Sequence, residues 1–401
     1  MTRPQLAHSL ADALPELAHE EPGTRFENPQ LVALNEPLAA ELGLDVAWLR
    51  SRDGLRFLTG AYGGHAMAYA GHQFGQFVPL LGDGRALLLG DIGGREIQLK
   101  GSGLTVFSRR GTDGVGAVGP MLREHLVSAF MHAAGVPTTR SLAVLTTGGT
   151  VIRQQGAVPG GIVVRVARSH LRVGTVQYAA TQSEELTQKV VQAAGFMDAE
   201  TMLAEVTRRQ FDLVARWMRI GFVHGVMNTD NVALSGETID YGPCAFTERF
   251  DGAASFSSID RHGRYAFGNQ PNIIAWNMAR LAEALYPLLG AEKVDAYVKT
   301  VQATWDEAWA RWIGADLDGL NAAADITTYN REHGIGGTPG PVFIPRNHML
   351  QEAIDAAEQH GDYDKYHALL AAVSDPYNEK AGPEWMARPE GQLPYVTFCG
   401  T

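Results

Sequence analysis

The most specific chemical groups of the sequence lie in a polar segment that follows an amphipathic helix. Residues 221–231 read GFVHGVMNTDN, and residues 239–243 read IDYGP. Asn231 and Asp240 offer amide and carboxylate oxygens, which together with phosphate oxygens are the ligands that Mg²⁺ prefers. Asp230 lies beside Asn231 and offers a further acceptor oxygen. The two segments therefore predict a metal site with another carboxylate close by.

A lysine and a glutamate form a second candidate group. Lys100 ends a strand-like segment, precedes a glycine turn at 101–103 and is the only lysine in the first 188 residues. A compact cation on a flexible stem at such a turn suits a phosphate. Glu124 falls on a helix that is apolar on most sides, so we expect a buried carboxylate that needs a cationic partner. Lys100 is the natural partner; a solvated lysine and a surface glutamate are the alternatives.

Glycines and arginines supply a third group, which suits an anion. Gly82, Gly84 and Arg85 occur in LGDGR, where flexible backbone lets N–H groups approach a phosphate closely. Arg165 and Arg172 lie near the end of an expected strand, and two guanidinium groups so placed can clamp an anion. A tight hairpin turn and solvated arginines are the alternative interpretations.

The elements that must position these groups change type along the chain. Short strands are expected from about residue 77 to 168, because apolar and polar residues alternate there between glycine turns. In residues 95–100, Ile97 and Leu99 mark one face and Lys100 the other. A helix interrupts the strands at 120–134, and helical spacing dominates both the first 60 residues and the chain after about 184. Strands followed by helices predict an α+β protein or two lobes.

Composition limits the classes of function. The chain has 401 residues and a formal net charge of −11, whereas proteins that coat nucleic acid or anionic membranes are usually basic. Two cysteines are too few for a disulfide framework, and no apolar run reaches the length of a membrane helix. The first residues are acidic and lack the apolar core of a signal peptide. We expect a cytoplasmic protein without nucleic-acid or membrane partners.

The order of the candidate groups is that of a protein kinase. Glycine turn, lysine, glutamate and polar loop follow one another, and His224 precedes Asn231 by seven residues, as in the kinase catalytic loop. The aspartate that a kinase carries two residues after the histidine is Val226 here, and Asp230 offers the nearby carboxylate. A loop of unrelated polar residues is the alternative.

Over nearly its whole length the sequence resembles the selenoprotein O (SelO/YdiU) family. The resembling segments are 67–75 (MAYAGHQFG), 81–86 (LGDGRA), 98–103 (QLKGSG), 163–174 (VVRVARSHLRVG), 221–231 (GFVHGVMNTDN), 239–243 (IDYGP) and 263–271 (GRYAFGNQP). Several long motifs in the same order make the resemblance very specific.

The resemblance implies a bilobal protein-kinase-like fold of the α+β class. A helical segment and a strand-rich nucleotide-binding lobe would occupy residues 1–168, and a helical lobe with the catalytic loop, the metal site and the tail would occupy 169–401. The implied activity is that of a protein adenylyltransferase. It uses Mg²⁺, with Mn²⁺ as the alternative, and places AMP from ATP on Ser, Thr or Tyr hydroxyls of proteins, releasing pyrophosphate. ATP is held reversed relative to kinases.

Residue roles also follow from this resemblance. Asp230 accepts the hydroxyl proton, Asn231 and Asp240 hold the metal ion, and Glu124 orients Lys100. The residues implied to contact ATP are Gly82, Gly84, Arg85, Lys100, Asp113, Gly114, Arg165, Arg172 and Asp240.

The sequence departs from the family in two places. Residues 108–124 read SRRGTDGVGAVGPMLRE, one residue longer than the usual SRRGDGRAVLRSSIRE, with Val115 in place of an arginine. The chain is also shorter than many members after about residue 315. Two other functions stay open: phosphoryl transfer with Asp230 as base, and a non-catalytic nucleotide-binding scaffold.

The two cysteines occupy positions that suggest regulation. Cys244 follows IDYGP directly, where a kinase has its activation segment, and Cys399 lies in the C-terminal FCGT, where family members carry a terminal Cys or selenocysteine. These positions alone suggest a regulatory disulfide between Cys244 and Cys399. A buried free thiol at Cys244 is the alternative.

Overall fold

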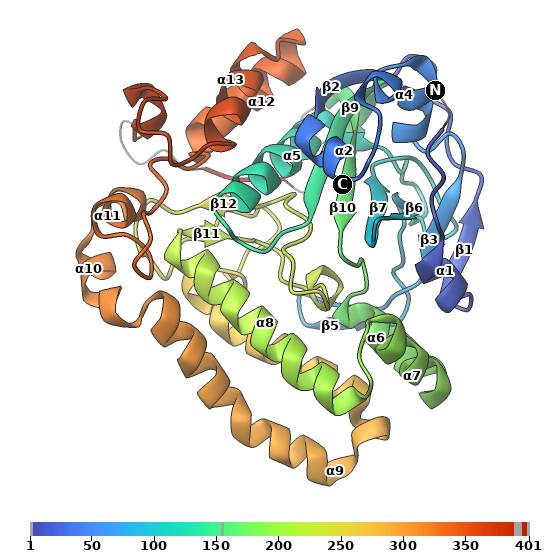
Figure 1. The fold of residues 1–401 in the computed structure, drawn as a ribbon, viewed down its shortest axis with the longest axis vertical. Helices are drawn as coiled ribbons and strands as arrows, with labels where there is room; N and C mark the ends of the chain where they lie inside the picture. The colour runs from blue at the N-terminus through green and yellow to red at the C-terminus, as the bar shows by residue number, and fades with distance from the viewer. Residues whose placement is uncertain (1–2, 154–155, 389–394, 399–401) are drawn as a thin grey trace.

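An antiparallel sheet forms the core of the first part of the molecule (Figure 1). The computed structural model describes residues 3–153, 156–388 and 395–398. Within these residues the sheet has eight strands in the order β1-β3-β6-β7-β10-β9-β2, with β8 paired to β10. The strands are β1 (Ala18–Glu21), β2 (Gln30–Leu34), β3 (Gly64–Met67), β6 (Ala86–Ile92), β7 (Arg95–Lys100), β8 (Gly116–Ala117), β9 (Arg140–Arg153) and β10 (Gly156–Ala167). The hairpin of β4 (Gly71–Gln73) and β5 (Gln76–Val78) is separate from this sheet.

The alternation in β7 gives the sheet two different faces. Ile97 and Leu99 belong to an apolar core that the sheet shares with three short helices. These helices are α2 (Glu36–Glu41), α3 (Val46–Leu49) and α4 (Arg52–Leu58). Glu96, Gln98 and Lys100 lie on the other face because successive side chains of a strand alternate, and all three are buried. The polar face of β7 is therefore an interior surface.

Helix α5 (Val118–Ala133) packs on β9 and β10, and nearly all of its side chains are buried. Gly135, with φ 74°, follows its end. Two C-terminal helices, α12 (Asn347–His360) and α13 (Asp364–Val373), also pack on α5. Glu358 accepts a hydrogen bond of 3.0 Å from the N–H of Gly119, and Tyr366 lies 2.7 Å from His125 Nδ1. Helix α5 is thus enclosed between the sheet on one side and the helices α12 and α13 on the other.

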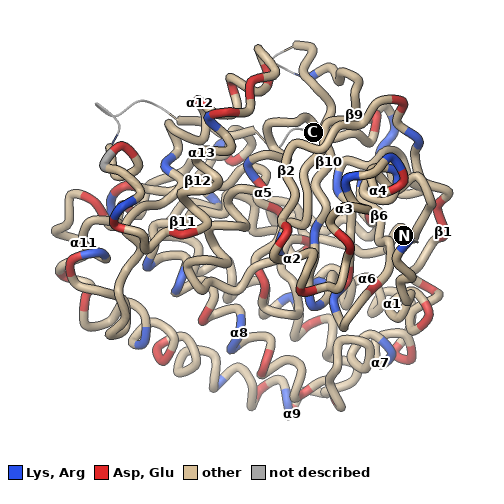
Figure 2. Tube along the Cα trace, turned by 45° about the horizontal axis from the view of Figure 1, so that its top comes forward, with Lys and Arg blue, Asp and Glu red and all other residues tan. Residues whose placement is uncertain are grey.

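The remaining chain is mainly helical, with α8 and α9 side by side (Figure 1). The helices not yet named are α1 (Ser9–Ala13), α6 (Val173–Gln182), α7 (Glu184–Ala193), α8 (Ala199–Arg219), α9 (Gln270–Trp312), α10 (Leu317–Ala322) and α11 (Ile326–His333). Gly290, with φ 73°, interrupts α9. Acidic and basic residues are interspersed along α8 and α9 (Figure 2). Among the described helices, none is both long and apolar enough to cross a membrane.

The antiparallel, strand-rich first part and the helical second part confirm the α+β class. One local expectation was wrong. Helical spacing predicted a mostly helical segment over residues 1–60, but residues 18–21 and 30–34 are strands β1 and β2. Leu31 and Leu34 pair with β9 and pack against the apolar core of the sheet. Pairing with a neighbouring strand therefore outweighed the local helical spacing of apolar residues.

Candidate active site

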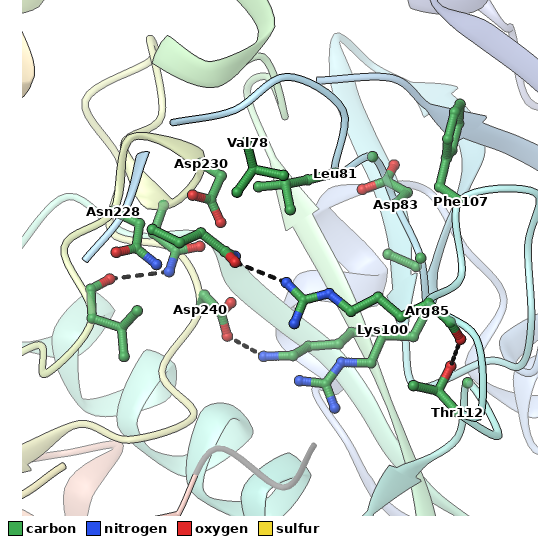
Figure 3. Close-up of a pocket in the computed structure, with 18 of the residues that line it drawn as sticks. Val78, Leu81, Asp83, Arg85, Lys100, Phe107, Thr112, Asn228, Asp230 and Asp240 are labelled. Atoms are coloured by element: carbon green, nitrogen blue, oxygen red, sulfur yellow. Dashed lines mark hydrogen bonds and ion pairs between the residues drawn. The ribbon is translucent and has the colours of Figure 1, made fainter. Parts of the chain in front are cut away.

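A cavity of about 1250 Å³ lies where the sheet, the β4–β5 hairpin and the loops after α8 meet. Most of the residues singled out in the sequence line it: Gly82, Gly84, Arg85, Lys100, Asp113, Gly114, Arg165, Arg172, Asp230, Asn231 and Asp240. Glu124 and Cys244 lie behind the lining, and Cys399 lies outside the described residues. Figure 3 shows Asp240 and Lys100 pointing toward each other in this cavity, with Asp230 nearby. The structure thus brings together groups that are up to 158 residues apart in the sequence, from Gly82 to Asp240.

Lys100 is held by two carboxylates. Its Nζ lies 2.7 Å from Glu124 Oε2 and also contacts Asp240 Oδ1. Lys100 is on β7, and Glu124 is on α5, which crosses the polar face of the sheet. The ion pair inferred from the sequence is therefore present, and both partners are buried.

Arg165 completes this network from the neighbouring strand. In β10 it lies one strand away from Lys100, and its Nε contacts Glu124 Oε1 while Nη2 lies 3.5 Å from Asp240 Oδ1. Burial alone would raise the pKa of Glu124, but Arg165 and Lys100 lower it overall. Burial also opposes ionisation of Asp240, yet Lys100 and Arg165 lower its pKa well below the ordinary value. Lys100 and Arg165 therefore contact two carboxylates that stay ionised, Glu124 and Asp240.

Arg172 lies on the other side of the cavity. Its Nη1 donates a hydrogen bond of 3.0 Å to the carbonyl oxygen of Asp230, and its guanidinium lies over the Tyr69 ring at 4.5 Å. Its Nη2 lies 3.7 Å from Asp83 Oδ1. The described carboxylate nearest to this buried cation is therefore Asp83, which sequence analysis did not select.

Asp83 is almost fully buried, with 1% exposure. Its Oδ2 accepts hydrogen bonds from the N–H of Met67 at 3.1 Å and from Gln98 Nε2 at 3.2 Å. The signal for it was present in LGDGR, where the carboxylate stands between the two glycines. Gly82 has φ 63°, and a Cβ there would meet the Phe107 ring at 2.4 Å. The glycine turn thus places Asp83 inward, where it faces Arg172.

Asp230 is the candidate base. It lies in a short 3-10 turn over Thr229–Asn231, and its side chain is buried. Burial raises the pKa of Asp230 to about 6, and Arg172 and a hydrogen bond from Gln73 only partly oppose this. Its Oδ1 has no hydrogen-bond partner among the described residues. A buried carboxylate with an unused oxygen and a pKa near neutrality is suited to accept a proton.

The proposed metal ligands offer unused oxygens next to this base. Asn231 donates from Nδ2 to the carbonyl of Val226 at 3.0 Å, which leaves its amide oxygen available to a cation. Asp240 uses Oδ1 for both Lys100 and Arg165, so Oδ2 is the oxygen left for a cation. The backbone of Asp240 has φ 65°, a region that non-glycine residues adopt rarely and mostly at functional sites. This donor set fits a hard divalent ion.

The altered loop after Lys100 closes one end of the cavity. Asp113 pairs with Arg153 of β9 at 2.9 and 3.0 Å, and this pairing lowers the pKa of Asp113. Arg153 also donates to the carbonyl of Val115 and lines the cavity. Sequence analysis did not select Arg153, because nothing in its local pattern distinguishes it from a solvated strand residue.

Cys244 lies close to the C-terminal tail. It is buried, and burial raises the pKa of its thiol to about 12. The preceding residue, Pro243, accepts a hydrogen bond of 2.6 Å from Thr397 Oγ1, and Ser257 pairs with Thr397. Residue 397 is therefore beside the segment that carries Cys244, whereas Cys399 lies outside the described residues.

Comparison with known proteins identifies the family of the chain. Residues 5–330 match the family model described as protein adenylyltransferase SelO. The protein nucleotidyltransferase YdiU of Mycolicibacterium paratuberculosis is 45% identical over 97% of this chain and 96% of its own length. Those of Mycolicibacterium smegmatis and Corynebacterium efficiens are 44% and 43% identical over 98% of this chain, covering 97% and 95% of their own lengths. The chain is an enzyme of the nucleotidyltransferase class, and it belongs to the SelO family of protein adenylyltransferases.

Proposed function

We propose that the protein transfers AMP from ATP to the hydroxyl groups of Ser, Thr or Tyr side chains in other proteins and releases pyrophosphate. The observation that carries this proposal is one cavity in which buried cations and a buried carboxylate face the same space. Lys100, Arg165 and Arg172 supply the cations, and Asp230 supplies the carboxylate. The nucleotide would contact these cations, Arg85, Gly82, Gly84 and the turn at Asp113 and Gly114.

The proposed reaction is a displacement at the α-phosphorus. The acceptor hydroxyl oxygen forms a bond to this phosphorus, the bond to the bridging oxygen of the β-phosphate breaks, and the electron pair leaves with pyrophosphate. The hydroxyl proton goes to Asp230. Lys100, Arg165 and Arg172 stabilise the negative charge that grows on the leaving group. Glu124 acts as a positioning residue because it holds both Lys100 and Arg165.

Asn231 and Asp240 would hold a divalent ion, Mg²⁺ with Mn²⁺ as the alternative. When bound, such an ion neutralises phosphate charge and orients the nucleotide. Lys100 and Arg165 contact Oδ1 of Asp240, so the ion would share this carboxylate with the two cations.

The architecture proposed for this site is the bilobal protein-kinase-like fold. Residues 1–168 would form the strand-rich nucleotide-binding lobe, and residues 169–401 the helical lobe. Three features support it: the antiparallel sheet with α5 on one face, the Lys100–Glu124 ion pair between them, and a catalytic turn after α8. Val226 in place of the kinase aspartate is consistent with a base at another position.

Isotope position separates AMP transfer from phosphoryl transfer. The protein is incubated with Mg²⁺ and ATP labelled with ³²P either at the α- or at the γ-phosphate, and labelled protein is separated from nucleotide. We expect label only from the α-position and an added AMP in the intact mass. Label from the γ-position alone would establish the kinase reaction instead. If neither label is transferred and Asp240→Ala leaves every measured activity unchanged, a non-catalytic nucleotide-binding scaffold is favoured.

The redox hypothesis is a separate part of the proposal. Thr397 contacts Pro243, the residue before Cys244, and Cys399 follows Thr397 by two positions in the sequence. Oxidation by glutathione disulfide would then join the two thiols and reduce the oxidant to two molecules of glutathione. We expect a Cys244–Cys399 peptide by mass spectrometry under non-reducing conditions. If oxidised protein yields only the free or glutathione-bound peptides, the hypothesis is wrong.

A further inference from the structure

Phe74 occupies a backbone conformation that is unfavourable for an aromatic residue. The β4–β5 hairpin pairs Gln73 with Gln76, so its loop consists of Phe74 and Gly75. Their φ values are 51° and 84°, which is the pattern of a type I′ turn, where Asn-Gly is strongly preferred. A bulky residue with positive φ has a strained backbone, and residues strained in this way are found most often at binding and active sites. The hairpin therefore places an aromatic ring at its tip at a cost in stability.

The hairpin tip is fixed to the loop that carries Asp230. Asn228 accepts hydrogen bonds from the N–H of Phe74 at 3.1 Å and from the hydroxyl of Tyr265 at 2.5 Å. The rings of Phe74 and Tyr265 meet edge to face with centroids 5.2 Å apart. Thr229 accepts a hydrogen bond of 2.7 Å from the N–H of His72. The aromatic tip is thus held at a fixed place beside the candidate base.

Apolar side chains remain exposed around this end of the cavity. Phe74, Leu80 and Ile259 line the cavity and are 37%, 49% and 45% exposed. Phe77, on the same hairpin, is 43% exposed. Clustered exposed apolar residues mark interaction sites more often than scattered ones do.

Arginines surround the same end of the cavity. Arg109 lines it and donates to Gln73 at 2.8 Å, and Arg110 is its exposed neighbour. Arg264 lies at the Gly75 turn and over the Trp276 ring at 5.0 Å. Arg261, near Ile259, is exposed. These four arginines form no ion pair with a carboxylate of the described residues, in a chain whose net charge is −11.

A buried aspartate fixes the loop that carries two of these arginines. Asp260 accepts hydrogen bonds from the N–H groups of Arg264 and Tyr265 at 2.8 and 2.7 Å. Ile259 and Arg261, on either side of Asp260, are therefore presented outward at a defined position. Apolar and cationic groups together make this surface complementary to one kind of partner.

We propose that the β4–β5 hairpin and the loop 259–264 form the docking surface for the acceptor protein. It fits an extended segment with an apolar side chain next to the modified hydroxyl and an acidic side chain close by. The apolar side chain would contact Phe74 and Ile259, and the acidic one Arg261 or Arg264. This inference rests on the proposed AMP transfer to proteins.

A peptide library tests the surface directly. The probe is a set of degenerate synthetic peptides with one central Tyr, Ser or Thr, incubated with the full chain, Mg²⁺ and ATP, and sequenced after enrichment of adenylylated products. We expect enrichment of apolar and acidic residues next to the hydroxyl. Enrichment of basic residues, or no preference at all, would overturn the proposal.

Phe74→Asn separates docking from folding. It creates the preferred Asn-Gly turn, so the hairpin should be at least as stable as before. For the best peptide of the library we expect KM to rise roughly tenfold, as for loss of an aromatic anchor, with the KM for ATP unchanged. Met197→Asn, at a side chain that is 86% exposed outside the cavity, is the matched control. An unchanged peptide KM in Phe74→Asn would show that the hairpin does not bind the acceptor.

Arg261→Glu tests the charge. We expect the preference for acidic residues to disappear, whereas Lys299→Glu on α9, with the same charge change, should keep it. A retained acidic preference in Arg261→Glu would exclude this arginine from docking.

Failure of the proposed function gives a different result. The wild-type chain would then transfer AMP neither to the library nor to itself, and the proposed docking surface would be wrong as well.

Discussion

Arg172 donates a hydrogen bond to the backbone carbonyl of Asp230, so a cation proposed to contact the nucleotide is bonded to the residue proposed as base. The two residues come from different parts of the fold, the start of α6 and the turn after α8. A change that moves one of them is therefore expected to move the other.

Asp230→Asn should stabilise the protein while abolishing transfer. The folded-state pKa of Asp230 is about 6, above its ordinary value of 3.8. Stability linked to this group is fully present below pH 3.8 and is lost as the pH rises to about 6, because only the unfolded chain ionises freely in that window. Asparagine removes the cost of the buried charge, which is at most about 3 kcal/mol at pH 7. Urea unfolding at pH 7.5 and at pH 4 measures the free energy of unfolding of the variant and the wild type. The variant should be more stable at pH 7.5 and nearly equal to the wild type at pH 4. A variant less stable than the wild type at pH 7.5 would contradict the burial argument.

The rate of transfer should fall on acidification. Asp230 accepts a proton only when ionised, so kcat/KM for the acceptor should decline below about pH 6, the pKa that burial gives this carboxyl. The measurement is the initial rate of AMP transfer between pH 4.5 and 8.5 at low acceptor concentration. A rate that stays constant down to pH 4.5 would assign the proton to another group.

Asp83→Asn should destabilise the fold through Arg172. Removing one charge of a buried pair leaves the other uncompensated, which costs about 3 kcal/mol. Because ATP phosphates would supply the missing negative charge, added Mg²⁺ and ATP should raise the melting temperature more in the variant than in the wild type. Glu307→Gln, at an exposed position on α9, is the control and should change stability by less than about 0.5 kcal/mol. Equal stability of Asp83→Asn and wild type would mean that Asp83 does not balance Arg172.

Gly71→Ala should reduce transfer strongly in a protein that still folds. A Cβ at residue 71 would come within 2.4 Å of Asp230 Oδ1, so the carboxylate must move. We expect a loss of roughly a hundredfold in kcat, since small displacements of catalytic groups have effects of this size. Gly314→Ala is the matched control because its Cβ would meet its nearest neighbour at 3.7 Å. Wild-type kcat in Gly71→Ala would show that the position of Asp230 is not critical.

Local sequence pattern predicted the Lys100–Glu124 pair for a physical reason. Lys100 lies on the polar side of a strand, and Glu124 lies on a helix whose apolar pattern predicts burial. A buried carboxylate requires a cationic partner, and Lys100 is the simplest one that the sequence offers. The structure confirms this pair at 2.7 Å.

Other contacts could not be read in this way. Asp83 pairs with Arg172 across 89 residues, and the turn LGDGR looks the same whether its aspartate points to solvent or inward. Strand β2 was missed because its partner β9 is more than 100 residues away, whereas helical spacing of apolar residues is visible locally. What sequence reasoning missed was long-range packing, which depends on neighbours that local patterns do not identify.

The enclosure of α5 has a consequence for how the enzyme is made. Glu124 needs α5 in place, and α5 is covered by α12 and α13 through Glu358 and Tyr366. These residues emerge from the ribosome more than 230 positions after Glu124. A nascent chain that has completed its sheet therefore still lacks the cover over the helix whose Glu124 pairs with Lys100. We expect this ion pair to be fully enclosed only near the end of translation.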